Sequence, residues 1–186
     1  MSYTEEQKAY FLRKMRTRML TLDINKDGHI SYEDYENMGK KVGEDSQMTE
    51  EQAEATKREF AKFSERLNLK PGEKIPVEEA AKKVTEIILA STPAQSKARF
   101  DKSHNLIFDA IDTNKSGQIS LKEFKEYFRI TAPSVSEAEI TYSFNTIDSN
   151  KDGVISREEF MAAAEDFFCG VEGIEVSKVF LGRLVE

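Results

Sequence analysis

Three twelve-residue segments repeat one arrangement of oxygen-bearing side chains around a glycine, at 23–34, 112–123 and 148–159. We call them loops I, III and IV. In each loop, positions 1, 3, 5 and 12 carry a side-chain oxygen, position 7 offers its backbone carbonyl, and glycine at position 6 permits a sharp turn. The side chains are Asp23, Asn25, Asp27 and Asp34 in loop I, Asp112, Asn114, Ser116 and Glu123 in loop III, and Asp148, Asn150, Asp152 and Glu159 in loop IV. The position-7 carbonyls belong to His29, Gln118 and Val154.

These ligand types predict calcium sites, because Ca²⁺ is a hard cation that binds roughly six to eight oxygen atoms. One acidic turn containing a glycine can arise by chance on a protein surface. Three copies, each between segments with helical periodicity, indicate helix–loop–helix calcium-binding units of the EF-hand type. We expect the His29 ring to face solvent, since position 7 binds the ion through its carbonyl.

The three loops should differ in their preference for metal. Loop I has Asp34 rather than glutamate at position 12, and the shorter side chain favours coordination by about six oxygens, so loop I should also accept Mg²⁺. Loop III has Ser116 at position 5, which leaves Asp112 and Glu123 as its charged ligands and predicts weaker calcium binding there.

A degenerate fourth loop is expected between loops I and III, because EF-hands pair through their loops. Aligning Ile75 with the position-8 isoleucine of loop I, Ile30, places this loop II at 68–79. Lys70 then stands where an oxygen ligand is required, and Gly72 lies one residue away from the turn position. We therefore predict no calcium in loop II, although Ile75 can still pair with Ile30 through a short strand contact.

Helical periodicity dominates the sequence outside the loops. Helices are expected over 5–22, 31–42, 49–68, 77–91, 97–111, 121–131, 136–147 and 157–168. Thr49 with Gln52, and Ser136 with Glu139, form capping-box patterns at two helix starts.

The fold class is therefore all-α, with two pairs of EF-hands in one compact domain over 1–186. The N-terminal pair covers 1–92, the C-terminal pair with its apolar tail covers 93–186, and the junction is expected within 90–98. The apolar tail, 176–185, is a candidate lid.

The composition argues against several other classes of protein. The formal net charge is −7 and no basic block occurs, so nucleic acid is not expected as a partner. The sequence has no run of about eighteen apolar residues for a membrane span, and Met1–Tyr10 lacks the apolar core of a signal peptide. A single cysteine, Cys169, suits a reducing cytoplasm, and no cluster of residues suggests a nucleophile or an acid–base pair. We expect a cytoplasmic monomer that is not an enzyme.

Taken together, the three loops, the degenerate loop II, the long N-terminal pair and the apolar tail resemble the sarcoplasmic calcium-binding protein superfamily. Within it, AYFLRKMRTRM (9–19), LNLKPGEKIPVEEA (67–80), FNTID (144–148) and VFLGRLVE (179–186) are most similar to its calcium-triggered coelenterazine-binding (luciferin-binding) branch. The segment 67–80 is the most informative, because it lies in loop II, where shared metal chemistry cannot explain the similarity. The resemblance implies a compact globule with a central apolar cavity, coelenterazine as a ligand and a luciferase as its acceptor.

Alternative functions are open at this point. A plain cytosolic calcium buffer would fill the cavity with its own side chains, and a sensor would open a methionine-rich groove, although the methionines here are scattered. Arg18 and Tyr35 are the candidate ligand contacts, since both flank loop I near the apolar stripe of their helices, but Arg18 could instead reach solvent. Light emission is not expected, because related photoproteins hold their luciferin with tryptophan and this chain has none.

Overall fold

Helices make up most of the chain in the computed structural model, which describes residues 3–45 and 49–185, apart from the side chains of Asp45, Pro93, 97–100 and Lys102. They are α1 (Glu5–Leu22), α2 (Tyr32–Asp45), α3 (Glu50–Arg66), α4 (Val77–Leu89), α5 (Pro93–Ile111), α6 (Leu121–Thr131), α7 (Glu137–Ile147), α8 (Arg157–Cys169) and α9 (Glu175–Val179). Four short strands interrupt them: β1 (His29–Ser31), β2 (Lys74–Pro76), β3 (Gln118–Ser120) and β4 (Val154–Ser156). The all-α prediction is confirmed. Within the described ranges, no helix combines the length and apolar character needed to cross a membrane.

Capping boxes fix most of the helix starts. The two predicted at Thr49 and Ser136 are both formed, with the side chain of each cap accepting from the third helical N–H and the third side chain accepting in return. A third box, at Thr92, combines with a proline at the first helical position and starts α5 at Pro93. The predicted start of this helix at 97 was therefore wrong, and the junction between the EF-hand pairs shrinks to residues 90–92.

The four loops pair as the sequence predicts. β1 and β2 run antiparallel with Ile30 opposite Ile75, and β3 and β4 run antiparallel with Ile119 opposite Ile155. Loop II departs from the other loops where its sequence does. Gly72 lies two residues before β2, whereas the glycine of loop I lies directly before β1. Pairing through the isoleucines is thus retained without the turn geometry of a calcium loop.

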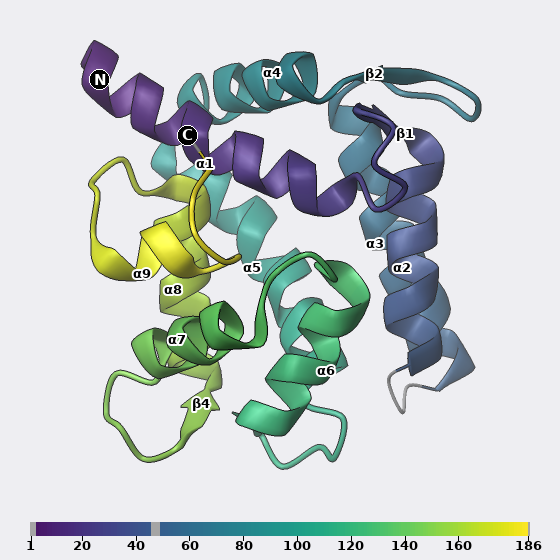
Figure 1. Cartoon of the computed structure of the whole chain (residues 1–186). Helices are drawn as coiled ribbons and strands as arrows, with labels where there is room; N and C mark the ends of the chain where they lie inside the picture. The colour runs from purple at the N-terminus through teal and green to yellow at the C-terminus, as the bar shows by residue number, and fades with distance from the viewer. Residues whose placement is uncertain (1–2, 46–48, 186) are drawn as a thin grey trace.

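The helices of the N-terminal pair are long, as expected from the wide spacing of its loops. α2 and α3 have 14 and 17 residues, against 11 each for α6 and α7. α2 and α3 lie side by side (Figure 1), and Gly39 is the reason they can approach closely. A Cβ atom at Gly39 would lie 2.9 Å from the Cα of Lys57. A glycine inside a helix is costly, so its presence here follows from packing.

The tail folds back across the N-terminal helix, with the C-terminus next to α1 (Figure 1). Arg13 Nε donates to the carbonyl of Val185 at 2.6 Å, and the N–H of Val185 donates to Thr17 Oγ1 at 3.0 Å. Phe180 is buried and joins a cluster of rings with Phe167 and other phenylalanines of the C-terminal pair. These contacts tie the last residues of the chain to its first helix.

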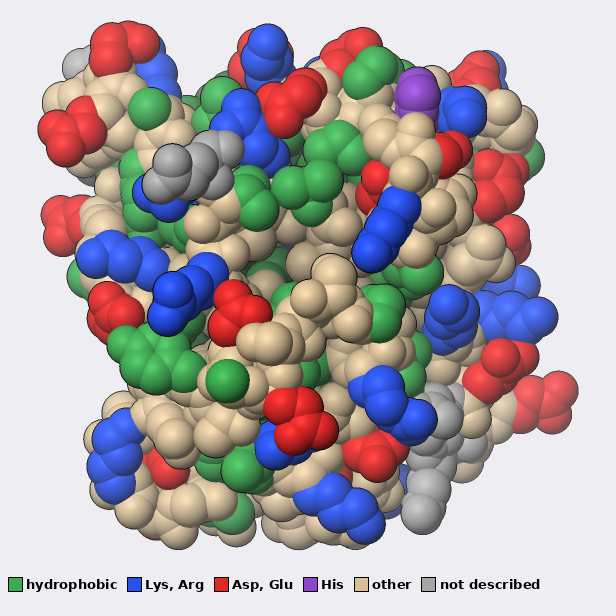
Figure 2. Space-filling view, in the orientation of Figure 1, with side chains coloured by type: hydrophobic (Ala, Val, Ile, Leu, Met, Phe, Trp, Pro, Cys, Tyr) green, Lys and Arg blue, Asp and Glu red, His purple; other side chains and the backbone are tan. Residues whose placement is uncertain are grey.

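A buried lysine crosses between the two EF-hand pairs. On the face shown in Figure 2, acidic and basic side chains are interspersed on the surface, but the Lys14 side chain of α1 is fully buried. Its Nζ donates to the carbonyl of Asp166 at 3.0 Å and to the carbonyl of Gly170. These carbonyls end α8, where the helix dipole favours a cation. The ring of Phe11 lies 4.8 Å from Nζ, so aromatic faces complete the site.

The stability of the fold should consequently depend on the charge of Lys14. Burial lowers the pKa of Lys14 from 10.5 to about 7, against smaller opposing effects of Cys169 and Asp166. Between these two pH values the unfolded chain holds a proton that the folded chain has released, so the free energy of unfolding contributed by this group rises with pH. We expect the stability advantage of the natural chain over Lys14→Met to grow between pH 7 and pH 9.5 in urea unfolding. The control Lys83→Met removes a half-exposed lysine and should show no such growth, and a constant advantage for Lys14 would contradict the prediction.

Candidate calcium loops and interior pocket

The first ligand of each loop also ends the preceding helix. Asp23, Asp112 and Asp148 are the C-caps of α1, α5 and α7, and the N–H of each donates to a carbonyl in the last helical turn. Each carboxylate then accepts from the N–H of the loop glycine, at 2.8 to 3.1 Å. These glycines have φ of 77°, 82° and 88°, a region that favours glycine, so the predicted turn at position 6 is present in all three loops.

Positions 1, 3 and 5 are gathered by shared hydrogen bonds in loops I and III. In loop I the N–H of Asp27 donates to Asp23 Oδ1 at 3.1 Å and to Asn25 Oδ1 at 2.9 Å. In loop III the N–H of Ser116 donates to Asp112 Oδ1 at 2.9 Å and to Asn114 Oδ1 at 2.8 Å. In each of these loops the side-chain oxygens of positions 1 and 3 therefore converge on the backbone N–H of position 5.

Loop IV differs from loops I and III in one carboxylate oxygen, Asp148 Oδ1, whose environment suits a bound cation. The N–H of Asp152 reaches Asn150 Oδ1 at 2.8 Å. Asp148 Oδ1 is buried and has no hydrogen-bond partner among the described residues. A buried carboxylate oxygen without a donor is costly, and coordination of a metal ion is one way to compensate it. The residues of this loop thus fit the calcium ion that its sequence predicts.

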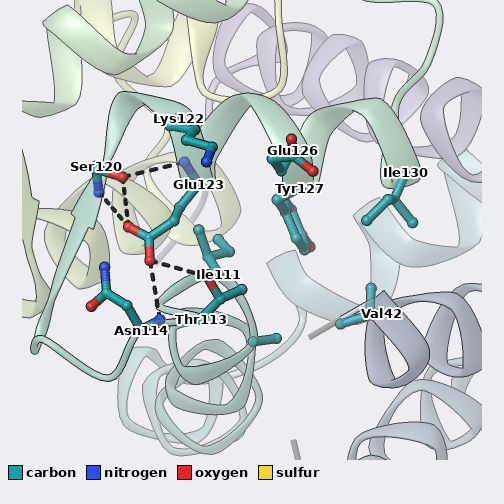
Figure 3. Close-up of a pocket in the computed structure, with 11 residues that line it drawn as sticks. Val42, Ile111, Thr113, Asn114, Ser120, Lys122, Glu123, Glu126, Tyr127 and Ile130 are labelled. Carbon is teal, nitrogen blue, oxygen red and sulfur yellow. Dashed lines mark hydrogen bonds between the residues drawn. The ribbon is translucent and has the colours of Figure 1, made fainter. Parts of the chain in front are cut away.

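The position-12 carboxylates are held at the start of the following helices by serine at position 9. Asp34 Oδ2 accepts from the N–H and hydroxyl of Ser31, at 2.8 and 2.6 Å. Glu123 accepts from Ser120 with one oxygen and from Thr113 and Asn114 with the other, as Figure 3 shows, at the edge of an open groove of about 380 Å³. These contacts bring position 12 back toward the start of its loop.

Hydrogen bonds to the position-12 carboxylate of loop IV, Glu159, lower its pKa strongly. Its burial, the largest single influence, favours a raised pKa, but hydrogen bonds from Ser156, the hydroxyl of Ser149 and the N–H of Asn150 together outweigh it and lower the pKa of Glu159 to about 2. This carboxylate is therefore ionised at neutral pH, as a calcium ligand must be. The same residue completes the capping box that starts α8.

The carboxylates alone do not form a metal cluster. Among residues 3–45 and 49–185, no three acidic, histidine or cysteine side chains converge as ready metal ligands. Amide, hydroxyl and carbonyl oxygens make up much of each predicted set, and the position-12 carboxylates are engaged by serine. The His29 ring is half-exposed, with Nδ1 2.9 Å from the carbonyl oxygen of Asp27, and the sequence assigned it no ligand role.

The interior contains two small neighbouring cavities, of about 60 and 30 Å³. Both predicted ligand contacts, Arg18 and Tyr35, line the larger one, and Arg18 also lines the smaller. The walls of the larger are otherwise formed by apolar and aromatic side chains with two further polar residues, Arg66 and His104. The site is therefore an apolar space with a few basic groups, lined by helices of both EF-hand pairs.

Two tyrosines, the buried Tyr35 and the partly buried Tyr127, interact electrostatically with Arg18. Burial raises the pKa of Tyr35 to about 12, although the positive charge of Arg18 opposes the shift. Burial likewise raises the pKa of Tyr127, again against Arg18. Both phenols are therefore protonated at neutral pH, and the hydroxyl of Tyr35 donates to Met19 Sδ at 4.0 Å. Arg18 lines a cavity with each of them, with Tyr35 in the larger cavity and with Tyr127 in the smaller.

The cavity implied by the resemblance is smaller than expected. Ligand pockets for molecules of this kind measure roughly 300–1,000 Å³. Here aromatic side chains occupy the centre, with the ring of Phe168 against that of His104 at 4.7 Å between centroids. His104 was not among the predicted contacts, since nothing in the sequence separates a buried histidine of α5 from a surface one. The position of Arg66 at the end of α3 gave no signal either.

Comparisons with known proteins agree with this architecture. The sequence pattern of an EF hand matches residues 18–38, and that of an EF-hand domain pair matches residues 100–165. Neither stretch includes loop II. The chain is 39% identical over 182 residues to the luciferin-binding protein of Renilla reniformis, covering 98% of both proteins. It is 33% identical over 179 residues to the sarcoplasmic calcium-binding protein of Perinereis vancaurica tetradentata, covering 94% of this chain and 98% of the relative.

Solved structures place the fold in the same group. The crystal structure of coelenterazine-binding protein from Renilla muelleri, in the calcium-loaded apo form, has 38% sequence identity and a TM-score of 0.77, covering 98% of this chain and 100% of that one. Calcium-loaded apo-aequorin from Aequorea victoria has 20% identity and a TM-score of 0.70, covering 95% and 99%. The second likeness concerns the fold alone.

Proposed function

Because the chain belongs to the EF-hand family of calcium-binding proteins that includes luciferin-binding protein, we propose that it holds a coelenterazine-like luciferin and releases it when calcium binds. Loops I, III and IV would hold the metal through the side chains and position-7 carbonyls described above, with Mg²⁺ accepted in loop I. The pairs 1–92 and 93–186 would act as one domain. We further propose a cytoplasmic monomer without enzymatic activity that passes its luciferin to a luciferase.

One observation carries this proposal: the residue after each position-12 ligand lines an interior cavity. Tyr35 follows Asp34, Phe124 follows Glu123, and Phe160 follows Glu159. A bound calcium ion would supply positive charge beside the position-12 carboxylate of each loop. Because that carboxylate belongs to the first turn of the following helix, a shift of the carboxylate away from its serine would shift this turn as well. The cavity wall would therefore move with each loop, which is what calcium-triggered release requires.

The polar lining suits an aromatic ligand with oxygen substituents. Arg18 can donate to a phenol or carbonyl oxygen, and Tyr35 can donate or accept through its hydroxyl. The surrounding side chains are apolar, so they favour an aromatic body over a charged or sugar-like one. These two residues are our proposed ligand contacts, with His104 and Arg66 added from the structure.

The small size of the cavities favours a second candidate, a calcium buffer without a small-molecule ligand. A buffer needs only a filled core, and Phe168 and the neighbouring rings fill this one. A carrier must instead displace those rings to reach the required volume. The two functions therefore differ in one measurable property, the uptake of ligand by the calcium-free protein.

The decisive experiment mixes calcium-free protein with coelenterazine and removes free ligand on a desalting column. We expect visible absorbance to co-elute with the protein and to be lost when Ca²⁺ is added before a second column. Retention without release would contradict the trigger, because the ligand would then be insensitive to the loops. Absence of any retained chromophore would favour the buffer.

Replacing Arg18 tests the proposed pocket directly. Arg18→Met keeps the length and apolar character of the side chain but removes its charge, so we expect at least about tenfold weaker retention of coelenterazine from the loss of charge-assisted hydrogen bonds. The matched control is Arg129→Met, which removes an arginine that is exposed on α6 and pairs with Glu126. Calcium binding by the loops should be unchanged in both variants. Equal retention of coelenterazine by the two variants would show that Arg18 does not contact the ligand.

A further inference from the structure

We propose that Lys74 of the degenerate loop II is an internal counter-cation of loop I, which lowers the affinity of loop I for divalent metal. The inference rests on the proposed binding of metal by loop I. It goes beyond it by giving loop II a role: this loop does not bind calcium itself but regulates its partner. No family pattern matched above includes loop II.

The contact that carries this inference joins the two paired loops. Lys74 Nζ lies 3.1 Å from Oδ2 of Asp27, the position-5 ligand of loop I. The same strand pairing brings the N–H of Gly72 to Glu33 Oε1 at 2.7 Å. The ammonium therefore pairs with one of the two carboxylate oxygens of a predicted calcium ligand.

Lys74 reaches Asp27 because of the strand register. Lys74 stands opposite Ser31 across the β1–β2 pair. In the C-terminal pair the corresponding positions belong to Val154, opposite Ser120, and to Gln118, opposite Ser156. Both of these side chains are neutral. The chain thus contains its own comparison: of its three predicted calcium loops, loop I is the one that faces a lysine from the partner strand.

The expected effect follows from simple electrostatics. A metal ion bound to Asp27 would lie within about 6 Å of the ammonium group, and repulsion between a divalent and a monovalent cation at that distance in water weakens binding by about tenfold. Screening at about 0.1 M salt reduces the effect to about threefold. Because both side chains are partly exposed, the effect must also fade at high salt.

The test isolates loop I by placing Glu123→Gln and Glu159→Gln together, so that loops III and IV lose their position-12 charge. Calcium is then titrated calorimetrically into this background with and without Lys74→Met. We expect Lys74→Met to tighten binding to loop I by about three- to tenfold at 20 mM KCl and by less than about twofold at 500 mM KCl. Lys74→Arg, which keeps the charge, should bind like the background.

Lys83→Met is the matched control, because it removes a half-exposed lysine of the same EF-hand that pairs with Glu79 on α4. Equal affinities for the background and Lys74→Met, or the same gain for Lys83→Met, would overturn the role of Lys74 alone. A different result would overturn more than the role of Lys74. If the Glu123→Gln, Glu159→Gln protein and its Lys74 variants bound no calcium while the unsubstituted chain still did, loop I would not be a metal site, and this inference would fail with it.

A gain-of-charge variant gives a second test. Gln118→Lys introduces a lysine at the register from which it can reach Asp152 of loop IV, and it keeps the position-7 carbonyl of loop III. We expect it to weaken calcium binding to loop IV, measured in a Glu123→Gln background, by about threefold relative to Gln118→Met at low salt. No difference between the lysine and methionine variants would contradict the electrostatic explanation.

Discussion

Replacing Glu159 with glutamine should weaken calcium binding by loop IV by at least about a hundredfold, because the loop loses the carboxylate that we propose binds the ion with two oxygens. The helix should persist. Gln at the third position of α8 still completes the capping box with Ser156, so the substitution removes charge and one ligand but keeps the local structure. This separation of metal binding from folding makes Glu159 the most informative position in the loops.

The measurement is calorimetric titration with calcium, supported by circular dichroism of the metal-free protein. Glu158→Gln is the control, since Glu158 is exposed in the same helical turn and carries the same charge. We expect the control to bind three calcium ions with affinities close to those of the natural chain. If Glu158→Gln and Glu159→Gln bound calcium alike, the ligand assignment in loop IV would be wrong.

The loops were predictable because their chemistry is local. A twelve-residue pattern fixes which atoms can face an ion, and the same residues fix the helix ends beside it. Asp148 illustrates this: one side chain ends α7, accepts from the loop glycine and leaves an oxygen free for metal. The pairing of Ile30 with Ile75 was predictable for the same reason, since it depends on alignment of one apolar residue per loop.

The pocket was less predictable because it depends on contacts between distant segments. Arg18 and Tyr35 were found from their helical faces and proximity to loop I, and both line the larger cavity. The sequence could not show that Phe168, 150 positions after Arg18, lines the same cavity. Lys14 is a similar case: helical periodicity places it on α1, but only the packing of α8 buries it.

The tail was also predictable only in part. Its apolar sequence predicted that it folds back, but the anchor that holds it, Val185 on Thr17 and Arg13, joins the two ends of the chain and has no local signature. Leu181 lines the smaller cavity together with Phe180. The tail is therefore part of the wall around the proposed ligand, and its contribution can be separated from that of the calcium loops.

Phe180→Ala should cost about 3–5 kcal/mol of unfolding free energy, the usual range for removing a buried phenylalanine. The ring is 5% exposed and lies 5.8, 5.5 and 6.2 Å, between centroids, from Phe160, Phe167 and Phe168. Alanine would leave a void beside the smaller cavity and free the tail to move. We also expect the variant to lose coelenterazine during desalting without calcium, because the wall over the ligand is weakened.

Urea unfolding of the calcium-free protein provides the stability measurement, and Ile174→Ala provides the control. Ile174 is apolar but 42% exposed just before α9, so its replacement should cost less than about 1 kcal/mol. Phe180→Leu tests whether the lost packing volume explains both effects. It retains most of the apolar volume, so it should restore much of the stability and the ligand retention together. A Phe180→Ala variant as stable as Ile174→Ala would show that the tail does not pack on the ring cluster in solution.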